Sequence, residues 1–188
     1  AMFILDETTN IVQLNAAAVF MTGGSDSDAL QHRPGNALRC IHSSKDPRGC
    51  GYSKACKVCN VRNGVEALIA NGGTIHGAEL ALELIRDGAP EKVWMSIGAE
   101  PIQLNGRRHV CVSMDDITAR KRAEEALRES NELFSLFMKH SPIYAFIKAV
   151  TPSESRNLRI SDKFQDMLGL PASEMVGKTM AELFPAAL

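Results

Sequence analysis

The 188-residue sequence has no long hydrophobic run and no excess of charge of one sign. No apolar stretch approaches the roughly 18 residues that a membrane-spanning helix needs. The opening residues AMFILDETTN contain neither the basic start nor the apolar core of a signal peptide. With 21 basic and 22 acidic residues the net charge is −1, which argues against a nucleic-acid partner. We therefore expect a cytoplasmic region without membrane contact.

Several catalytic and cofactor-binding motifs are also missing. There is no GxxxxGK[ST] phosphate loop and no Gly-x-Ser-x-Gly nucleophile motif. Covalent c-type haem needs Cys-x-x-Cys-His, whereas Cys59 is followed by Asn60. His32, His42 and His76 are candidate axial ligands for non-covalent haem, but isolated histidines are more often surface or core residues. We see no catalytic constellation and expect this region not to be an enzyme.

Cysteine is scarce except in one segment. The stretch CIHSSKDPRGCGYSKACKVC holds four of the five cysteines with the spacing C-x9-C-x5-C-x2-C. A Cys-x2-Cys turn can bring two thiols to one metal, and four thiolates suit either zinc or an iron–sulfur cluster. His42 is a substitute ligand. The candidate metal ligands are Cys40, Cys50, Cys56 and Cys59.

Other interpretations of this segment stay open. Structural zinc usually shows two Cys-x2-Cys pairs, and only one is present. Lys54 and Lys57 could lower a thiol pKa, so the segment could hold a redox pair without metal. A disulfide clip would need an oxidising compartment, and reduced thiols without any function are the plainest alternative. The fifth cysteine, Cys111, stands alone in an expected strand, where packing is its expected role.

Hydrophobic patterning predicts an α+β fold. Runs of alternating polarity bounded by turn residues indicate five strands, and the last three are consecutive, so they must form an antiparallel meander. An amphipathic helix is expected where Val61, Val65, Leu68 and Ile69 recur on one face. Short helices are expected before it, and the chain is polar from Ser25 to Pro34, with Pro34-Gly35 as a breaker. The predicted strands cover residues 2–5, 11–14, 74–85, 92–102 and 109–118, and the predicted helices cover 16–21 and 59–71.

The segment DDITARKRAEEALRESNELFSLFMKHSP is charged and contains no glycine. Small and apolar residues recur along it at alternating intervals of four and three positions. This spacing defines a heptad seam, which is weak at its alanine-rich start. Asp115 and Asp116 are expected to cap this helix. A surface helix packed on its own domain remains an alternative, but the seam favours a two-stranded connector between domains. The seam residues are Ala119, Ala123, Ala126, Ser130, Leu133 and Phe137.

Beyond Pro142 the strand–strand–helix pattern of the opening returns without its closing strands. We interpret this as an internal repeat whose second copy is truncated. The expected organisation is a first domain over 1–116, a helical linker over 117–140 and the N-terminal part of a second domain over 141–188. Both ends suggest a piece of a longer protein.

Three stretches resemble PAS domains of bacterial sensor proteins. DDITARKRAEEALRES is similar to the Asp-Ile-Thr ending of such a domain running into a signalling helix, and FQDMLGLPASEMVGKTMAELFP to its early helical part. NALRCIHSSKDPRGCGYSKACKVC resembles a cysteine-bearing variant of the family. The resemblance implies a five-stranded antiparallel sheet with helices on one face, then a linker helix and half of a second PAS domain. Flavin photosensors of this family carry Asn-Cys-Arg-Phe-Leu-Gln, which ALRCIHSS lacks, so a flavin adduct at Cys40 is not expected.

Two function classes follow. The resemblance implies a sensory and relay module of a signal-transduction protein, a sensor histidine kinase or a diguanylate cyclase, that responds to a small ligand, a metal or the redox state. We expect a homodimer, because a half-domain exposes apolar faces. The alternative is a thiol–disulfide oxidoreductase built around Cys56 and Cys59, or a metal-binding module that uses the Cys40–Cys59 cluster. An oxidoreductase usually places this motif after a strand, whereas the segment before Cys56 reads as loop.

Overall fold

The computed structural model describes residues 1–185 of the chain. This part forms two compact units, Ala1–Lys121 and a second that begins at Arg122. The first contains a five-stranded sheet and the second a two-stranded sheet. Among the described residues, no helix combines the length and the apolar character needed to cross a membrane.

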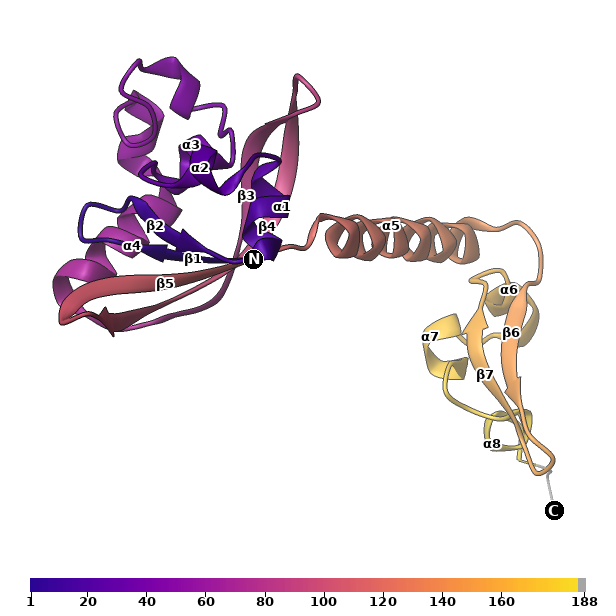
Figure 1. Ribbon diagram of the computed structural model, residues 1–188. Coiled ribbons are helices and arrows are strands. Elements are labelled where there is room, and N and C mark those ends of the chain that lie inside the picture. The colour runs from indigo at the N-terminus through magenta and orange to yellow at the C-terminus, as the bar shows by residue number, and fades with distance from the viewer. Residues whose placement is uncertain (186–188) are drawn as a thin grey trace. The chain divides into compact units, whose positions relative to one another are not determined.

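The sheet of the first unit is antiparallel throughout, with the strand order β2-β1-β5-β4-β3 (Figure 1). It confirms the predicted five-stranded sheet, including the meander of the last three strands. Asn105 and Gly106 have φ values of 51° and 76°, as expected for the tight turn between two of these strands. The strands are β1 (Met2–Leu5), β2 (Ile11–Leu14), β3 (Ile75–Arg86), β4 (Ala89–Leu104) and β5 (Arg107–Asp116).

Short helical segments separate β2 from β3. Asn15 caps the first, with its Oδ1 accepting the N–H of Ala18 at 2.9 Å, and Gly23 ends it with φ 65°. The breaker expected at Pro34-Gly35 was wrong, because Pro34 opens a helical turn instead. Proline suits that position, since the first N–H of a helix has no intrahelical partner. The segments are α1 (Ala16–Thr22), α2 (Asp26–Ala29), α3 (Pro34–Ala37), η1 (Ser43–Lys45), η2 (Lys54–Val58) and α4 (Asn60–Asn71).

The core of the first unit lies between one face of the sheet and these helices. Val65 and Leu68 of α4 are buried against it, as the amphipathic pattern predicted. Alternate residues of the strands are buried on this face, which confirms the predicted alternation in the last two strands. The buried strand residues are Phe3, Leu5, Ile11, Leu84, Val93, Met95, Ile97, Ala99, Val110, Val112 and Met114.

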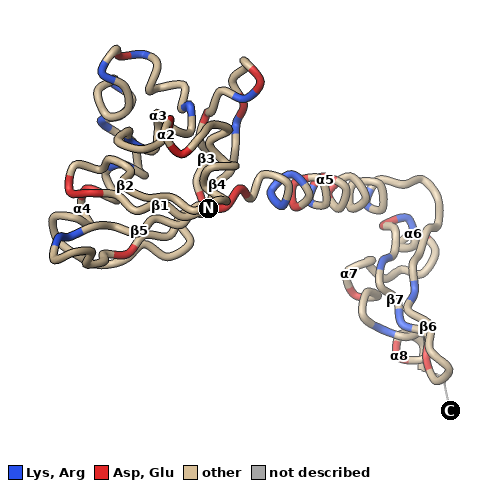
Figure 2. Tube along the Cα trace, in the orientation of Figure 1, with Lys and Arg blue, Asp and Glu red and all other residues tan. Residues whose placement is uncertain are grey.

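Strand β5 leads directly into α5 (Thr118–His140). The Oδ1 of Asp116 accepts the N–H of Thr118 at 2.9 Å, as expected for a capping residue, whereas Asp115 pairs with the N-terminal amino group at 3.6 Å. The hydroxyl of Thr118 accepts the N–H of Trp94 at 2.9 Å, and Ile117 donates its N–H to the carbonyl of Trp94 at 2.9 Å. These bonds fix the start of α5 to the middle of β4. Both signs of charge occur along the first half of the helix (Figure 2).

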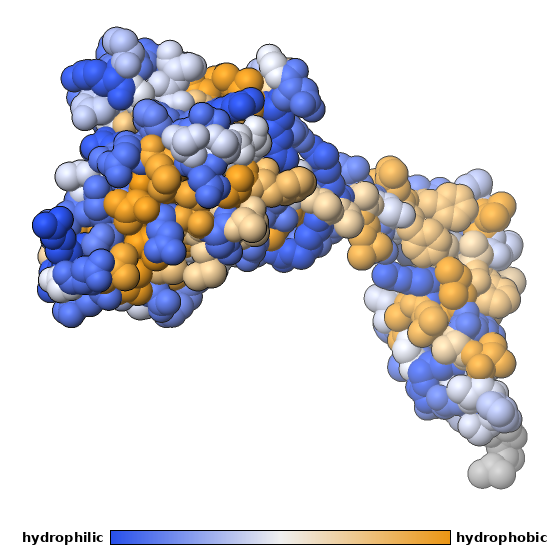
Figure 3. Space-filling view, viewed as in Figure 1, coloured by the Kyte–Doolittle hydropathy of each residue, from blue (hydrophilic) through white to orange (hydrophobic). Residues whose placement is uncertain are grey.

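The second unit repeats the strand–strand–helix order that the sequence predicted, with one additional helical turn at α7. Buried Asn157 donates its N–H to the carbonyl of Lys178 at 2.9 Å, and Thr179 caps α8 together with Glu182. Hydrophobic side chains remain on its surface (Figure 3). Its elements are β6 (Phe146–Val150), β7 (Ser155–Ile160), α6 (Phe164–Leu168), α7 (Ala172–Met175) and α8 (Met180–Leu183). The final residues of the predicted second domain, 186–188, lie outside the described residues.

Candidate functional site

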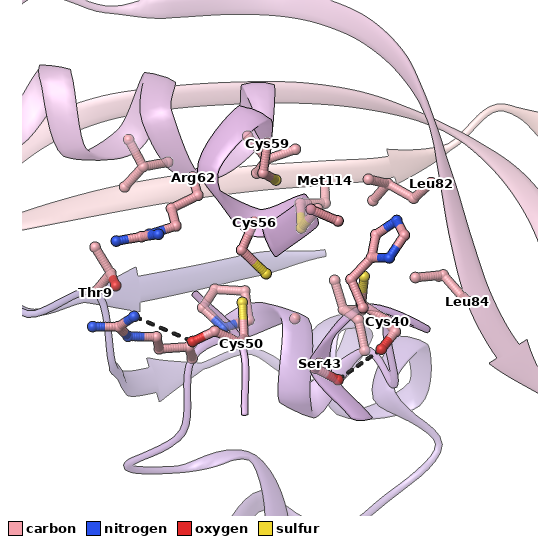
Figure 4. Close-up of a pocket in the computed structure, with 18 of the residues that line it drawn as sticks. Thr9, Cys40, Ser43, Cys50, Cys56, Cys59, Arg62, Leu82, Leu84 and Met114 are labelled. Carbon is pink, nitrogen blue, oxygen red and sulfur yellow. Dashed lines mark hydrogen bonds between the residues drawn. The ribbon is translucent and has the colours of Figure 1, made fainter. Parts of the chain in front are cut away.

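The four clustered cysteines line one pocket of the first unit (Figure 4). The pocket has a volume of about 90 Å³ and lies between the sheet, α4 and the segments that precede α4. Its walls are mostly apolar, and two arginines and His42 also reach it. The apolar wall residues are Leu5, Leu38, Val61, Val65, Leu82, Leu84 and Met114.

Cys40 is held at the free edge of the sheet. It forms an isolated bridge with Leu84 of β3, and the neighbouring Ile41 donates its N–H to the carbonyl of Glu83 at 3.0 Å. On the other side, Ile85 donates its N–H to the carbonyl of Arg39 at 2.9 Å. A residue that precedes β3 by some thirty positions is thereby fixed against that strand.

Residues in and next to α3 hold Cys50 in place. Its N–H donates to the Oδ1 of Asn36 at 2.5 Å, and its carbonyl accepts from the Nη1 of Arg33 at 3.2 Å. Gly35 lies directly under its thiol, where a Cβ would stand 2.5 Å from the Cys50 Sγ. Gly49 and Gly51 have φ values of 89° and 98°, so this tight loop uses conformations that favour glycine.

Cys56 and Cys59 come from η2 and from the start of α4. Cys56 is only 5% exposed, and its Sγ lies 3.2 Å from the hydroxyl of Ser53. Cys59 is the N-cap residue of α4. The Nη1 of Arg62, one turn into that helix, donates to the carbonyl of Gly51 at 2.7 Å and so ties the cysteine loop to α4. Figure 4 shows the sulfurs of Cys50 and Cys56 turned toward each other.

The surroundings of the thiols shift their pKa values in opposite directions. Burial raises the pKa of Cys40 and of Cys50, and neighbouring cysteines raise it further by charge repulsion. Burial also acts to raise the pKa of Cys56, but the hydrogen bond from Ser53, backbone N–H groups and the charge of Arg62 outweigh it and lower that pKa. The predicted role of Lys54 and Lys57 was therefore wrong, because the cation that acts on Cys56 is Arg62.

The other candidate residues fall outside the pocket, with one exception. His42 lines it, and the Nδ1 of His42 is buried without a hydrogen-bond partner. His32 and His76 are exposed and do not line it. Cys111 pairs with Ile4 in the middle of the sheet and also lies outside this pocket.

Among residues 1–185, no three His, Cys, Asp or Glu side chains surround one position that could hold a metal ion. The metal set of Cys40, Cys50, Cys56 and Cys59 thus stays a prediction. The sequence reasoning missed Arg33, Asn36, Ser53 and Arg62 as supports of the loop, because no local motif marks them.

The seam residues predicted for the linker helix lie on α5. Ala123, Ala126, Leu133 and Phe137 are all exposed. Leu127 and Leu136 are exposed as well, so the apolar surface is broader than the predicted seam.

Replacement of Ser53 by alanine should raise the pKa of the Cys56 thiol. The substitution removes the hydrogen bond that stabilises the thiolate, while the burial that opposes ionisation stays. The rate of iodoacetamide labelling at Cys56, followed by mass spectrometry from acid to alkaline pH, should therefore reach half its plateau at a higher pH than in the wild type. Ser44→Ala, at an exposed hydroxyl that bonds the Ile41 carbonyl, should leave the profile in place. An unchanged profile in Ser53→Ala would show that this hydrogen bond does not determine the pKa of the Cys56 thiol.

Replacement of Gly35 by alanine should displace Cys50. The new Cβ would stand 2.5 Å from Sγ and 3.1 Å from Cβ of Cys50, so the loop must move. We expect a loss of about 1–3 kcal/mol in the free energy of unfolding, as for other overpacking substitutions. Urea titration measures it. Gly24→Ala is the control, because its Cβ would meet only the Asp28 side chain at 3.3 Å or more. Equal stability of the two variants would contradict the close packing of Cys50 on α3.

Comparison with known proteins identifies the family. A family profile described as "PAS domain" matches residues 1–119 and 144–187. The chain belongs to the PAS domain family. The match covers most of both units. The five-stranded sheet and the helices of the first unit agree with this assignment. A search of curated proteins gives no significant match.

Solved structures of PAS domains are similar to part of this chain. The PAS domain of nitrogen regulation protein NR(II) from Vibrio parahaemolyticus is 20% identical with a TM-score of 0.40, over 62% of this chain and 88% of that one. A PAS domain from Colwellia psychrerythraea is 17% identical with a TM-score of 0.42, over 63% and 86%. The PAS domain of an HTR-like protein from Haloarcula marismortui is 15% identical with a TM-score of 0.37, over 62% and 79%. The family assignment rests on the profile match.

PAS domains are sensory modules with a general role in signalling, and this PAS chain therefore has that role at the level of its family. The cysteine pocket lies on the core side of the PAS sheet, between the sheet and the helices. That location suits a small bound group, because it is concave and largely apolar.

Proposed function

We propose that this PAS chain is an input and relay module in which the state of the cysteine pocket is passed through β5 into α5. The observation that carries the proposal is the position of Met114. This fully buried β5 residue lines the pocket and lies four residues before the first residue of α5. A change in the pocket therefore acts on the strand that positions the signalling helix.

The start of α5 is attached to the sheet by charged groups as well as by backbone bonds. Glu79 of β3 pairs with Arg120 at 2.5 Å and with Lys121 at 2.7 Å. Arg86, at the end of the same strand, pairs with Asp116 at 2.8 Å. Strand β3 carries the pocket residues Leu82 and Leu84 between these two points. Two strands thus lead from the pocket to the first turn of the helix.

The signal that fits this pocket is a small ligand, a metal centre or the redox state of the thiols. For such a signal to act, it must bind or stabilise one arrangement of the sheet and helix over another. We further propose that α5 pairs with α5 of a second copy through its exposed apolar residues, and that a histidine kinase or diguanylate cyclase domain of the same protein receives the signal.

Hydrogen exchange of α5 tests the relay. The 188-residue chain is treated with iodoacetamide, and a control chain carries serine at Cys40, Cys50, Cys56 and Cys59 but keeps Cys111. We expect alkylation to change exchange in residues 117–125 of the first chain only. Unchanged exchange in both chains, with mass spectrometry confirming modified pocket thiols, would refute the relay. A change in both chains would assign the effect to Cys111.

One observation favours a second candidate, a thiol–disulfide oxidoreductase. The lowered pKa of Cys56 is the property that an attacking thiol needs. Its burial argues the other way, because a side chain that is 5% exposed is poorly placed to attack a disulfide of another protein. Catalytic reduction of insulin by the chain in the presence of dithiothreitol, lost in Cys56→Ser, would support the oxidoreductase and displace the relay.

A further inference from the structure

The number of thiols in the cysteine pocket is that of a metal centre and not that of a disulfide. A disulfide uses two thiols, whereas four thiols from four separate points of the chain line this one cavity. All four border the same cavity, and Figure 4 shows the sulfurs of Cys50 and Cys56 turned toward each other.

Backbone N–H groups are already directed at the sulfurs. Cys40 receives hydrogen bonds from the N–H groups of His42 and Ser43, and Cys50 receives one from Gly35. Cys56 receives them from Gly51 and Ser53. N–H bonds to sulfur stabilise thiolates, and they are among the features that tune iron–sulfur clusters. Backbone N–H groups thus already face three of the four sulfurs.

Four cysteines can hold either a zinc ion or an iron–sulfur cluster, and the two centres need different arrangements of the thiolates. A zinc ion draws its thiolates to about 2.3 Å from one point. No such point exists among the described residues, and the four cysteines border a cavity of about 90 Å³ instead. A cluster places its own iron and sulfide atoms between the thiolates, so it takes a wider ring of ligands. The spacing C-x5-C-x2-C is also near the C-x4-C-x2-C of plant-type ferredoxins.

The surroundings match the same centre. Apolar side chains from the sheet and from α4 line the pocket, and Gly35 leaves room for the Cys50 sulfur. Buried polar atoms are nearly always paired, so the unpaired Nδ1 of His42 in this wall needs an explanation. A bound anionic group such as a thiolate-ligated cluster would give this atom the partner that it lacks.

We propose that Cys40, Cys50, Cys56 and Cys59 together bind one iron–sulfur cluster in the pocket of the first unit. The inference rests on the proposed function in one respect: the cluster would be the group whose state the relay reports. The four cysteines are its ligands, and the N–H groups of the loop and Arg62 balance its negative charge. His42 is a positioning residue beside it and not one of the four ligands.

Anaerobic reconstitution tests the site. The full 188-residue chain is incubated with ferrous iron, sulfide and thiol reductant, desalted, and assayed for iron, acid-labile sulfide, zinc and free thiols, with a visible absorption spectrum. We expect equal amounts of iron and sulfide, a sulfide-to-iron charge-transfer band and four protected cysteines. Serine at any of the four positions should lower retained iron roughly tenfold or more, since even outer-shell substitutions cost about that much in metal affinity. Cys111→Ser is the matched control and should retain the cluster.

Three results would overturn the cluster. One zinc per chain with four protected thiols would replace it by a mononuclear site. Five free thiols after reconstitution, or equal iron loss in Cys111→Ser, would remove the site. Circular dichroism of each variant distinguishes loss of a ligand from unfolding. The iron, sulfide and free-thiol contents of the wild-type chain test the cluster even if every variant unfolds.

The two experiments can contradict the relay and the cluster independently of each other. The hydrogen-exchange experiment uses alkylated apo-protein and requires no metal. A chain that binds a cluster but shows no change in α5 on alkylation would retain the site and lose the relay. A chain without metal whose α5 responds to alkylation would retain the relay and lose the cluster.

Discussion

The double substitution Leu133→Glu and Phe137→Glu should convert a dimer of this chain into monomers. These side chains are 68% and 53% exposed on α5 and lie one turn apart on the predicted seam. Burying a large apolar side chain contributes about 1.5–3 kcal/mol, and the substitutions remove two from each copy. They also place four like charges along the interface. We expect the dissociation constant to rise by at least about a hundredfold, because each 1.4 kcal/mol is a factor of about ten.

Sedimentation equilibrium over a range of concentrations measures this change. Ser135→Glu adds a charge on another face of the same helix and should leave the dimer intact. A wild-type chain that stays monomeric at the highest concentration would contradict pairing through α5. A double variant that remains dimeric would place the interface elsewhere, for example on the exposed hydrophobic residues of β6 and β7.

Replacement of Met114 by alanine should destabilise the first unit by about 2–5 kcal/mol, the cost of truncating a buried methionine. Met114 is 1% exposed and contributes to both the core and the wall of the cysteine pocket. Its loss enlarges a cavity that is already present, and neighbouring side chains can only partly collapse into it. Urea denaturation followed by the fluorescence of Trp94, the single tryptophan, measures the change in the first unit alone.

Met2→Ala is the matched control for that experiment. Met2 lies on β1, next to β5, but is 48% exposed, and its truncation should cost less than about 1 kcal/mol. Similar midpoints for the two variants would mean that the pocket wall is loosely packed. In that case Met114 could not transmit a change in the pocket to α5.

Much of the fold followed from local patterns. Buried and exposed residues alternate in β4 and β5, because each strand has one face toward the core. The amphipathic α4 spans three turns, which is long enough to show its period. The sequence indicated short helices between β2 and α4 but did not place α2 and α3, and it did not predict α7, because four residues rarely display a helical repeat.

The site was less predictable than the fold. Clustering of the cysteines indicated one site, and all four do line one pocket. The supports of that pocket come from elsewhere in the chain: Arg33 and Asn36 precede the loop, and Arg62 follows it. Proximity in sequence suggested Lys54 and Lys57 as cations that could lower a thiol pKa, but both side chains turned out to be exposed. Charge effects depend on spatial distance, which the order of residues alone does not give.

The bridge between Cys40 and Leu84 has a consequence for solubility. Strand β3 is the last of the sheet, and its outer side would otherwise offer a row of unpaired N–H and carbonyl groups to another chain. Residues 39–41 cover part of that row with two backbone hydrogen bonds. Because the same three residues carry Cys40, the loop that forms the pocket also protects the sheet from edge-to-edge aggregation. Damage to the cysteine site would then appear first as self-association of the protein through β3.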